Sequence, residues 1–374
     1  MYRHSMPTMK LRLATLAGDG IGPEVTRQAM RVLQAVAAVT GLKVDISEHP
    51  VGAAAIRVAG VPLPEPTLAA CQAADAVFLG AVGDPAFDSQ PPALRPEAGL
   101  LALRTALGGF ANLRPAVSFE PVIDVSPLKA ERVRGADVLV VRELLGGLYY
   151  GEPRGREPGG GAAFNTLRYS VAEVERVARV AFEAAGTRRK LVTSVDKANV
   201  LETSRLWREV VTRVGLDYPE VTLRHMYVDS CAMRLATTPT EFDVLLTDNL
   251  FGDILSDEAA VIAGSLGLLP SATLGGNVAL YEPVHGSAPD IAGKDIANPI
   301  GAIGCIALLL RYTAHLPREA DAIDAATREV LALGLRPADL ARPGDTPAST
   351  SEIGAAVERA VVDSLERHWS YHGV

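Results

Sequence analysis

The chain has 374 residues, more than a single hydrophobic core usually accommodates, so two domains are expected. Its composition, with 48% hydrophobic and 21% charged residues, is that of a soluble globular protein. The net charge of −8 argues against a nucleic acid or an anionic membrane surface as a partner. Residues 1–10 lack the apolar segment of a secretory signal, no run of 18 apolar residues occurs, and the three cysteines show no CxxC spacing, so a cytoplasmic protein without a membrane span is predicted.

The first hundred residues alternate between strand and helix patterns. Strands are predicted over residues 11–17, 42–46 and 76–79, with helices over 23–39 and 67–73. Pro23 suits the first helical position, and the glycine-rich turn before it either approaches a ligand closely or serves only as a turn. Residues 80–96 form a loop at the carboxyl end of a strand, where α/β proteins tend to bind ligands. The alternation predicts an α/β fold with a parallel or mixed sheet flanked by helices.

Three arginines follow at the ends of predicted elements. Arg104 lies late in a predicted helix, Arg114 enters a strand, and Arg142 ends the apolar strand 137–141. Guanidinium groups match carboxylates bidentately, so the three predict a clamp for a substrate with carboxylate groups. The alternative is three separate surface arginines.

The middle of the chain places a lysine and an acid after predicted strands. Residues 152–163 are glycine-rich and predict an extended hairpin or arm, and an amphipathic helix follows over 171–185. Lys197 follows the strand 191–195, where it is either a general base or an ordinary solvated lysine. Asp229 is expected at the end of a strand over 221–228.

Two aspartates four residues apart follow the next buried strand. A helix is predicted to start just after Gly252, which places Asp253 and Asp257 on one of its faces. Like charges at this spacing destabilise a helix unless a positive charge lies between them, and Mg²⁺ or Mn²⁺ prefers carboxylate oxygens. The alternative is that Asp253 interacts with the helix dipole and Asp257 faces solvent.

The last third of the chain begins with glycine- and leucine-rich turns over residues 264–276. The polar segment 282–293 predicts either a nucleotide-binding loop or an ordinary surface loop. Helices are predicted over residues 300–313, 320–332 and 351–368.

Several motifs, taken together and in order, resemble the metal-dependent, pyridine-nucleotide-linked β-decarboxylating dehydrogenases of the isocitrate/isopropylmalate dehydrogenase family. The motifs are GDGIGPEV (18–25), GLLALR (99–104), ANLRP (111–115), VREL followed by GGLYYGEPRG (141–155), VDKANVLE (195–202), YVD (227–229), TDNLFGDILSD (247–257), GSLGLLPSA (264–272) and EPVHGSAPDIAGKDIANP (282–299). The resemblance extends over nearly the whole chain.

The resemblance implies a two-lobed α/β fold that is not a Rossmann domain, with a mixed sheet flanked by helices. Residues 1–109 and 264–374 would form a cofactor-side lobe from both chain ends, and residues 110–263 would form an inserted central lobe. The central lobe would pair with a second copy through its helices and an arm over residues 148–169, giving a homodimer with shared active sites.

The resemblance also implies roles for individual residues. Tyr149 and Lys197 would be the catalytic acid–base pair, with Lys197 coming from the partner subunit. Arg104, Arg114 and Arg142 would hold the carboxylates of a dicarboxylate substrate. Asp253 and Asp257, together with Asp229 of the partner subunit, would bind Mg²⁺ or Mn²⁺ and thereby the substrate.

Substrate and cofactor preference are also implied. Glu97, Leu100, Leu101 and Val200 would line an apolar pocket that suits an isopropyl group and disfavours a third carboxylate. Asp290 and Ile291 follow the pattern of NAD-linked members, in which the carboxylate accepts hydrogen bonds from ribose. The expected cofactor-binding residues are Ile21, Gly80, Ala81, Glu97, Glu282, His285, Gly286, Ser287, Ala288, Asp290, Ile291 and Asn298.

The expected reaction is therefore NAD-dependent oxidative decarboxylation of (2R,3S)-3-isopropylmalate within leucine biosynthesis. One departure from the family pattern is Leu145, which replaces a usual threonine close to Tyr149. The alternatives are a sister enzyme acting on tartrate, malate or homoisocitrate, and a non-catalytic regulatory subunit. The intact set of site residues disfavours the regulatory subunit.

Overall fold

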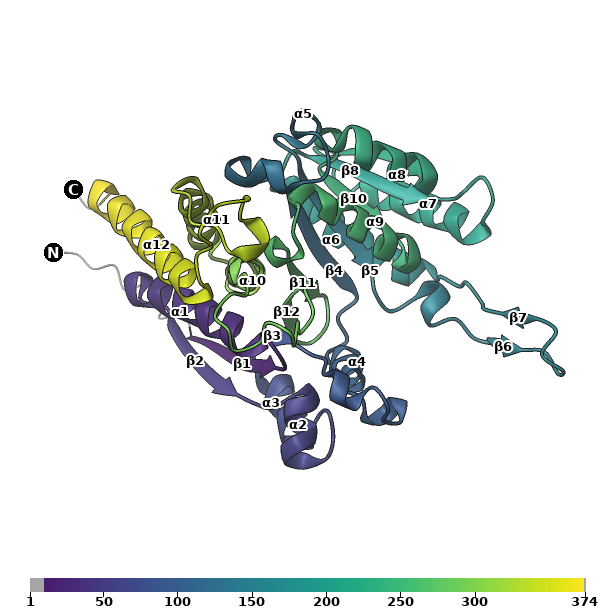
Figure 1. Ribbon diagram of the computed structural model, residues 1–374. Coiled ribbons are helices and arrows are strands. Elements are labelled where there is room, and N and C mark those ends of the chain that lie inside the picture. The colour runs from purple at the N-terminus through teal and green to yellow at the C-terminus, as the bar shows by residue number, and fades with distance from the viewer. Residues whose placement is uncertain (1–9, 373–374) are drawn as a thin grey trace. The chain divides into compact units, whose positions relative to one another are not determined.

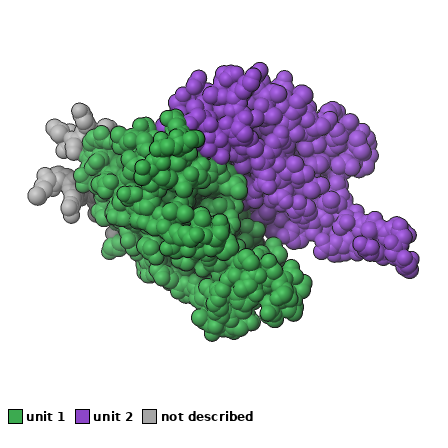
Figure 2. All heavy atoms as spheres, viewed as in Figure 1, with its two compact units in different colours: residues 1–109, 265–374 green, residues 110–264 purple. Residues whose placement is uncertain are grey.

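The structure, a computed structural model, describes residues 10–372 and divides into two compact units. Unit 1 consists of Met1–Gly109 with Ser265–Val374, and unit 2 consists of Phe110–Gly264 (Figure 2). Each unit contains its own strands and the helices that flank them, in agreement with the predicted α/β class (Figure 1). The expected N-terminal tail lies outside the described residues except for Lys10, which begins the first strand.

The strands of unit 1 run in the order β2-β1-β3-β12-β11. Their bounds are Lys10–Gly18 for β1, Lys43–Glu48 for β2, Ala76–Ala81 for β3, Pro270–Leu274 for β11 and Ala279–Pro283 for β12. All neighbours are parallel except β11 and β12, which are antiparallel. The turn expected over residues 264–276 therefore contains a strand, and its residues 271–273 are all buried despite the glycine-containing segments on either side.

The helices of unit 1 come from both ends of the chain. They are α1 (Gly22–Thr40), α2 (Gly52–Ala59), α3 (Glu65–Ala73), α4 (Pro96–Leu107), α10 (Ile300–Tyr312), α11 (Pro317–Ala332) and α12 (Thr350–His372). Helix α10 is apolar almost all round, which is typical of a buried helix, and it packs against α1, α11, β11 and β12. Helix α12 packs along α1 and α11, so the first and last long helices of the chain lie against each other (Figure 1).

The strands of unit 2 run in the order β4-β5-β10-β8-β9. Their bounds are Ala111–Val117 for β4, Asp137–Glu143 for β5, Leu191–Asp196 for β8, Thr222–Tyr227 for β9 and Val244–Thr247 for β10. Only β4 is antiparallel to its neighbour, so β5, β10, β8 and β9 all end at the same edge. The register pairs Thr247 with Arg142, which brings the residues after these strands to one edge.

Unit 2 contains five helices among the described residues. They are α5 (Ala130–Val133), α6 (Val171–Gly186), α7 (Glu202–Gly215), α8 (Val228–Thr237) and α9 (Asn249–Ala263). Leu255, Ala259 and Ile262 of α9 join a buried cluster with Val140 of β5 and Leu245 of β10. This packing fixes α9 on the sheet and leaves its other face available for polar chemistry.

A short hairpin projects away from the rest of unit 2 (Figure 1). It consists of β6 (Gly155–Arg156) and β7 (Ala163–Phe164) and lies within the expected arm. The chain also forms short 3₁₀ helices at Pro85–Phe87, Pro92–Leu94, Glu120–Val125, Gly147–Tyr149, Pro239–Glu241, Leu266–Leu268 and Ala338–Leu340. No helix among the described residues is long and apolar enough to cross a membrane.

Two predicted boundaries near the site are wrong. Helix α9 begins at Asn249 rather than after Gly252, because the Asp248 side chain caps it by accepting a hydrogen bond from the Phe251 amide at 2.7 Å. Asp229 does not end a strand but lies in the first turn of α8.

Candidate active site

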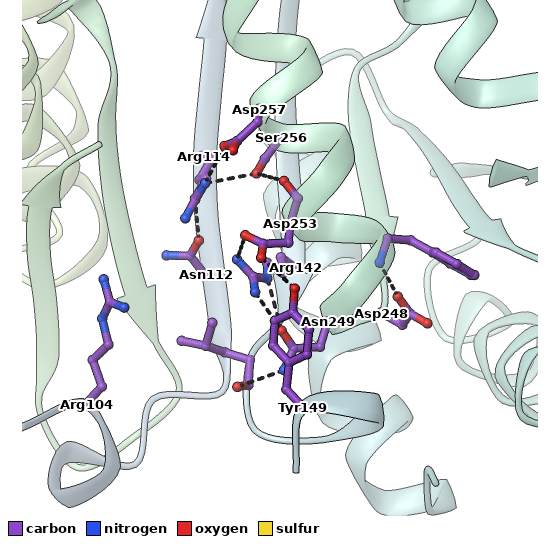
Figure 3. Close-up of polar contacts among 12 residues, drawn as sticks. Arg104, Asn112, Arg114, Arg142, Tyr149, Asp248, Asn249, Asp253, Ser256 and Asp257 are labelled. Carbon is purple, nitrogen blue, oxygen red and sulfur yellow. Dashed lines mark hydrogen bonds and ion pairs between the residues drawn. The ribbon is translucent and has the colours of Figure 1, made fainter. Parts of the chain in front are cut away.

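Helix α9 carries the two aspartates expected to bind a cation, and each carboxylate meets an arginine. Asp257 forms an ion pair with Arg114 at 3.2 Å, and Asp253 forms one with Arg142 at 2.5 Å (Figure 3). The positive charge that the spacing of the aspartates requires is therefore supplied, within this chain, by two arginines from neighbouring strands. These are two of the three arginines expected to hold substrate carboxylates.

Arg142 is largely enclosed, with 7% of its side chain exposed. Its Nε and Nη2 donate to Oδ1 of Asn249 at 3.2 and 2.8 Å, while Nη1 reaches Asp253. Gly252 makes this position possible, because a Cβ there would come within 2.6 Å of Cγ of Arg142. Glycine at the start of α9 thus lets the arginine lie directly against the helix.

Arg114 is held by polar groups from two elements. Its Nε donates to Asn112 Oδ1 at 2.9 Å on β4, and its Nη1 donates to Ser256 Oγ at 3.0 Å on α9. The guanidinium is therefore fixed independently of its contact with Asp257.

Tyr149 closes this cluster from the 3₁₀ helix that follows β5. Its hydroxyl donates to Oδ2 of Asp253 at 2.7 Å, and its ring lies 5.8 Å from the guanidinium carbon of Arg142. The hydrogen bond to Asp253 is the main cause that raises the pKa of Tyr149 above its ordinary value, while Arg142 opposes it. Within the chain, the charged group that contacts the phenol hydroxyl is therefore the Asp253 carboxylate, which favours the protonated form.

Lys197 and Asp229 form a second pair at the same edge of the sheet. Lys197 follows β8, Asp229 opens α8, and Nζ lies 2.6 Å from Oδ1. The bond from Lys197 is the main cause that holds the pKa of Asp229 below its usual value. Val200, in the turn after Lys197, is exposed. Among the described residues, no three acidic, histidine or cysteine side chains are grouped closely enough to hold a metal ion.

The remaining substrate candidates lie on α4 of unit 1. Arg104 donates to Oε1 of the buried Glu282 from Nε at 3.1 Å and from Nη2 at 2.7 Å. Leu101 lies three residues before Arg104 and four after Glu97, so the three share a face of α4. Leu101 is 58% exposed, whereas Leu100 packs against the core of unit 1.

Three segments expected to bind the cofactor meet in unit 1. The Ile21 amide donates to the Ser287 carbonyl at 2.8 Å, and the Asp19 amide donates to the Ala81 carbonyl at 2.8 Å. Gly20 allows this approach, because a Cβ there would come within 1.9 Å of the Ser287 carbonyl oxygen. The turn 18–22, the end of β3 with Gly80, and the 282–291 loop are therefore joined.

The side chains of the 282–291 loop differ in their surroundings. Nδ1 of His285 lies 3.0 Å from the Gly286 carbonyl oxygen, while its buried Nε2 has no hydrogen-bond partner among the described residues. Burial lowers the pKa of His285 and favours the neutral ring. Gly286 and Asp290 are exposed, whereas Ala288 and Ile291 are half-buried.

Asn298 and Glu97 complete the set of expected cofactor residues. Both polar groups of Asn298 have protein partners, since Oδ1 accepts from the Ile300 amide at 3.0 Å and Nδ2 donates to Asp339 at 3.0 Å. Glu97 is exposed, and its Oε1 lies 3.2 Å from the position that a Cβ on Gly83 would take.

Sequence reasoning missed several polar residues at this edge. Asn249, Glu143 and Tyr169 contact one another or Arg142, and Asn112 and Ser256 hold Arg114. For Glu143 and Asn249 a signal existed, because Glu143 is a polar residue at the end of the apolar strand β5 and Asn249 is one placed two residues after the apolar strand β10. No local signal marks Tyr169.

The chain belongs to the isocitrate/isopropylmalate dehydrogenase family, whose sequence pattern it matches over residues 12–357. It is similar to the 3-isopropylmalate dehydrogenase of Wolinella succinogenes, with 53% identity over 93% of this chain and 97% of the relative. It is also similar to the 3-isopropylmalate dehydrogenase of Salinibacter ruber, with 54% identity over 96% of this chain and 98% of the relative.

Solved structures agree with this assignment. The isocitrate dehydrogenase from Methylococcus capsulatus matches with a TM-score of 0.81 and 36% identity, over 94% of this chain and 99% of that chain. A β-decarboxylating dehydrogenase from Thermococcus kodakarensis matches with a TM-score of 0.81 and 37% identity, over 95% of this chain and 97% of that chain. The family and fold class expected from the sequence are confirmed.

Proposed function

We propose that the protein catalyses the NAD-dependent oxidative decarboxylation of (2R,3S)-3-isopropylmalate to 2-oxoisocaproate (4-methyl-2-oxopentanoate) and CO₂, in leucine biosynthesis. The proposal rests chiefly on the cluster of Arg142, Asp253 and Tyr149, which joins a carboxylate-binding group, a cation ligand and a proton donor. The names of the 3-isopropylmalate dehydrogenases that share about half of the sequence support this choice of substrate.

The residues at the sheet edge of unit 2 fit a hard divalent cation. Asp253 and Asp257 supply carboxylate oxygens from one face of α9, which is the donor type that Mg²⁺ and Mn²⁺ prefer. Two carboxylates leave most of the six coordination positions open for substrate and water. We propose that Asp229 of the partner subunit is the third protein ligand. The loop of unit 1 fits a dinucleotide, because it presents the unpartnered Nε2 of His285 and the exposed Asp290.

Bound Mg²⁺ or Mn²⁺ would act as a Lewis acid at the substrate's C2 oxygen, and bound NAD⁺ would accept the hydride from C2. The chain's own residues bind the substrate and move its protons. Arg104, Arg114 and Arg142 pair with the substrate carboxylates. Lys197 of the partner subunit removes the C2 hydroxyl proton as hydride leaves, which gives a β-keto acid. Loss of CO₂ from this acid leaves an enol, and the Tyr149 hydroxyl then protonates its carbon.

The substrate's side group is selected by apolar residues. Leu101 of α4 and Val200 of unit 2 have exposed apolar side chains. Exposure of apolar surface to water is unfavourable, and contact with the isopropyl group of the substrate would remove that surface from water. A third carboxylate beside these side chains would lose its hydration without gaining a partner. These side chains therefore favour the isopropyl group of isopropylmalate over the third carboxylate of isocitrate and homoisocitrate.

We also propose that unit 2 pairs with a second copy of the chain in the cytoplasm. Met233 on α8, Ile254 on α9 and Phe164 on the hairpin are large exposed apolar side chains, as expected of an obligate interface. The free, buried cysteines Cys71, Cys231 and Cys305 suit a reducing compartment.

The substrate assignment is tested by measuring NADH formation with 3-isopropylmalate, malate, tartrate, isocitrate and homoisocitrate, each with NAD⁺ or NADP⁺ and with Mg²⁺ or Mn²⁺. We expect kcat/KM to be highest for 3-isopropylmalate with NAD⁺. A higher value for any other substrate identifies a sister enzyme, and no turnover of any substrate identifies a regulatory subunit.

The shared active site has its own test in mixed dimers. Lys197→Met and Asp253→Asn should each abolish turnover in a pure dimer. When the two variants are refolded together at equal amounts, half of the dimers are mixed, and each holds one intact site of two. Recovery of about a quarter of the wild-type activity is therefore expected, whereas no recovery would show that both residues serve the same site from one chain.

A further inference from the structure

A set of buried polar groups lies beneath Arg142 and the loop that leads to Tyr149. Asn249, 1% exposed, is at its centre. Its Oδ1 accepts both hydrogen bonds from Arg142 (Figure 3). Its Nδ2 donates to the carbonyl groups of Leu144 at 3.2 Å and Gly146 at 3.1 Å. One side chain therefore holds the guanidinium and the loop in a single arrangement.

The same loop is held on its amide side by Glu143. This carboxylate is fully buried, and it accepts from the amides of Leu145 at 3.0 Å and Gly146 at 2.8 Å. Arg176 of α6 supplies a third donor at 3.3 Å. Burial raises the pKa of Glu143, and the donors around it oppose this change, so the carboxylate depends on them for its charge.

Tyr169 connects Asn249 and Glu143, the two residues that hold the loop. Its hydroxyl donates to Oε2 of Glu143 at 3.2 Å and accepts from the backbone amide of Asn249 at 3.0 Å. The ring is buried and lies edge-on to Trp207 at 5.5 Å between centroids. Its position is therefore fixed by packing as well as by its hydroxyl.

Two glycines of the loop lie against the Tyr169 ring. A Cβ at Gly146 would come within 2.7 Å of a ring carbon, and a Cβ at Gly147 would come within 2.5 Å of the hydroxyl. Gly147 also has φ of +72°, a conformation that favours glycine. The two glycines let the loop pass directly over Tyr169 just before it reaches Tyr149.

We infer that Tyr169 and Glu143 are positioning residues for the reaction: Tyr169 acts on Arg142 through Asn249, and Glu143 holds the loop carrying Tyr149 by its backbone amides. The hydrogen bonds described above join the two side chains to each other, to the backbone of Asn249, to Arg176 and to the loop amides of Leu145 and Gly146. The inference rests on the proposed function in one respect, that Arg142 and Tyr149 act on the substrate. Tyr169 is also the last residue of the arm, so a change in the arm's ordering reaches Arg142 through two hydrogen bonds.

The decisive variant is Tyr169→Phe, which removes the hydroxyl and leaves the ring. Its matched control is Tyr218→Phe, which removes the hydroxyl of another tyrosine of unit 2 that is bonded to Glu183 at 3.4 Å. For Tyr169→Phe we expect kcat/KM for 3-isopropylmalate to fall by about tenfold or more, with a raised KM for this substrate and an unchanged KM for NAD⁺. For Tyr218→Phe we expect kcat/KM and both KM values to stay within twofold of wild type.

Amide hydrogen exchange of the dimeric protein without substrate supplies a readout independent of turnover. In Tyr169→Phe the amides of residues 144–149 and of Asn249 should exchange about tenfold faster, while those of β8 and α7 keep their wild-type rates. Glu143→Gln, which retains the volume of the side chain, should accelerate the same amides. Should the wild type not use 3-isopropylmalate, the proposed function fails, and the exchange pattern still decides the positioning role.

The inference is overturned if Tyr169→Phe has wild-type kinetic constants. It is equally overturned if faster exchange spreads evenly over unit 2, because that pattern signifies only a loss of global stability.

Discussion

The hydroxyl of Tyr149 lies 2.7 Å from Oδ2 of Asp253, while Oδ1 of the same carboxylate meets Arg142 at 2.5 Å. The proposed proton donor and one proposed substrate-binding arginine thus share a single proposed cation ligand. A cation that binds Asp253 must share its oxygens with both groups. Cation binding, substrate binding and the state of the Tyr149 hydroxyl are therefore expected to be coupled.

Tyr149→Phe should lower kcat for oxidative decarboxylation by about 10²- to 10⁴-fold, the usual contribution of a general acid, because no other hydroxyl replaces it. KM for 3-isopropylmalate should change little, since the carboxylates are held by arginines. Steady-state kinetics measure both constants. Tyr150→Phe, the exposed neighbour, is the control and should retain kcat. A Tyr149→Phe enzyme with kcat close to wild type would contradict the assignment.

Asp257→Asn should raise the Mn²⁺ concentration needed for half-maximal activity by about tenfold or more, because it replaces a carboxylate oxygen with a weaker amide ligand. The variant also loses the charge that faces Arg114. Manganese titrations of NADH formation, with binding followed by electron paramagnetic resonance, measure the effect. Glu258→Gln, one residue further along α9, is the matched control. Equal manganese affinity in both variants would refute Asp257 as a ligand.

Leu101→Ala should lower kcat/KM for 3-isopropylmalate by about tenfold while leaving malate unaffected, because only the first substrate has an isopropyl group to cover. Leu101 is 58% exposed, so its loss should leave thermal stability unchanged. Leu266→Ala, which truncates another exposed leucine of unit 1, is the control and should change neither substrate. A parallel loss with both substrates would remove Leu101 from the pocket.

The parts of this molecule that are foreseeable from sequence are those with local causes. The apolar run Val138–Val141 forms a buried strand whatever surrounds it, and a family pattern identifies Arg142 and Asp253. The start of α9 was misplaced because the capping strength of Asp248 outweighs the glycine that follows. The Arg104–Glu282 ion pair joins residues 178 positions apart, so no local pattern could indicate it.

Tyr169 illustrates the remaining limit most clearly. Its neighbours in sequence are an ordinary arm and a helix cap, and nothing in them indicates a hydroxyl placed between Glu143 and Asn249. That arrangement exists because β5 and β10 lie side by side and end together. Networks of this kind arise from strand order, which spacing along the chain does not encode.

Asp248→Asn should remove a pH dependence of stability. Burial raises the pKa of Asp248 to about 7 in the folded chain, whereas the unfolded carboxyl has a pKa of about 3.9. Between these values the folded chain holds a proton that the unfolded chain releases, so the free energy of unfolding falls as pH rises from about 4 to about 7. Asparagine caps a helix as well as aspartate does and carries no charge.

The variant should therefore be more stable than wild type at pH 8 and equally stable at pH 4. Urea denaturation midpoints across this range measure the difference. Asp363→Asn, which changes an exposed aspartate of α12, should show the wild-type slope. A wild-type slope in Asp248→Asn would mean that this carboxyl is ionised in the folded chain throughout the range.

The division of the chain has a consequence for its synthesis. All strands of unit 2 lie within residues 110–264, so this unit is complete in the chain before any of β11, β12 or α10 to α12 has been translated. Unit 1 cannot complete its folding at that stage. Its sheet lacks two strands, and α1 lacks its packing partners α10 and α12, until the carboxyl end leaves the ribosome. The part of the protein that is translated first therefore completes its folding last. A fragment truncated after residue 264 should contain a protease-resistant unit 2, while its residues 10–109 should still be cut.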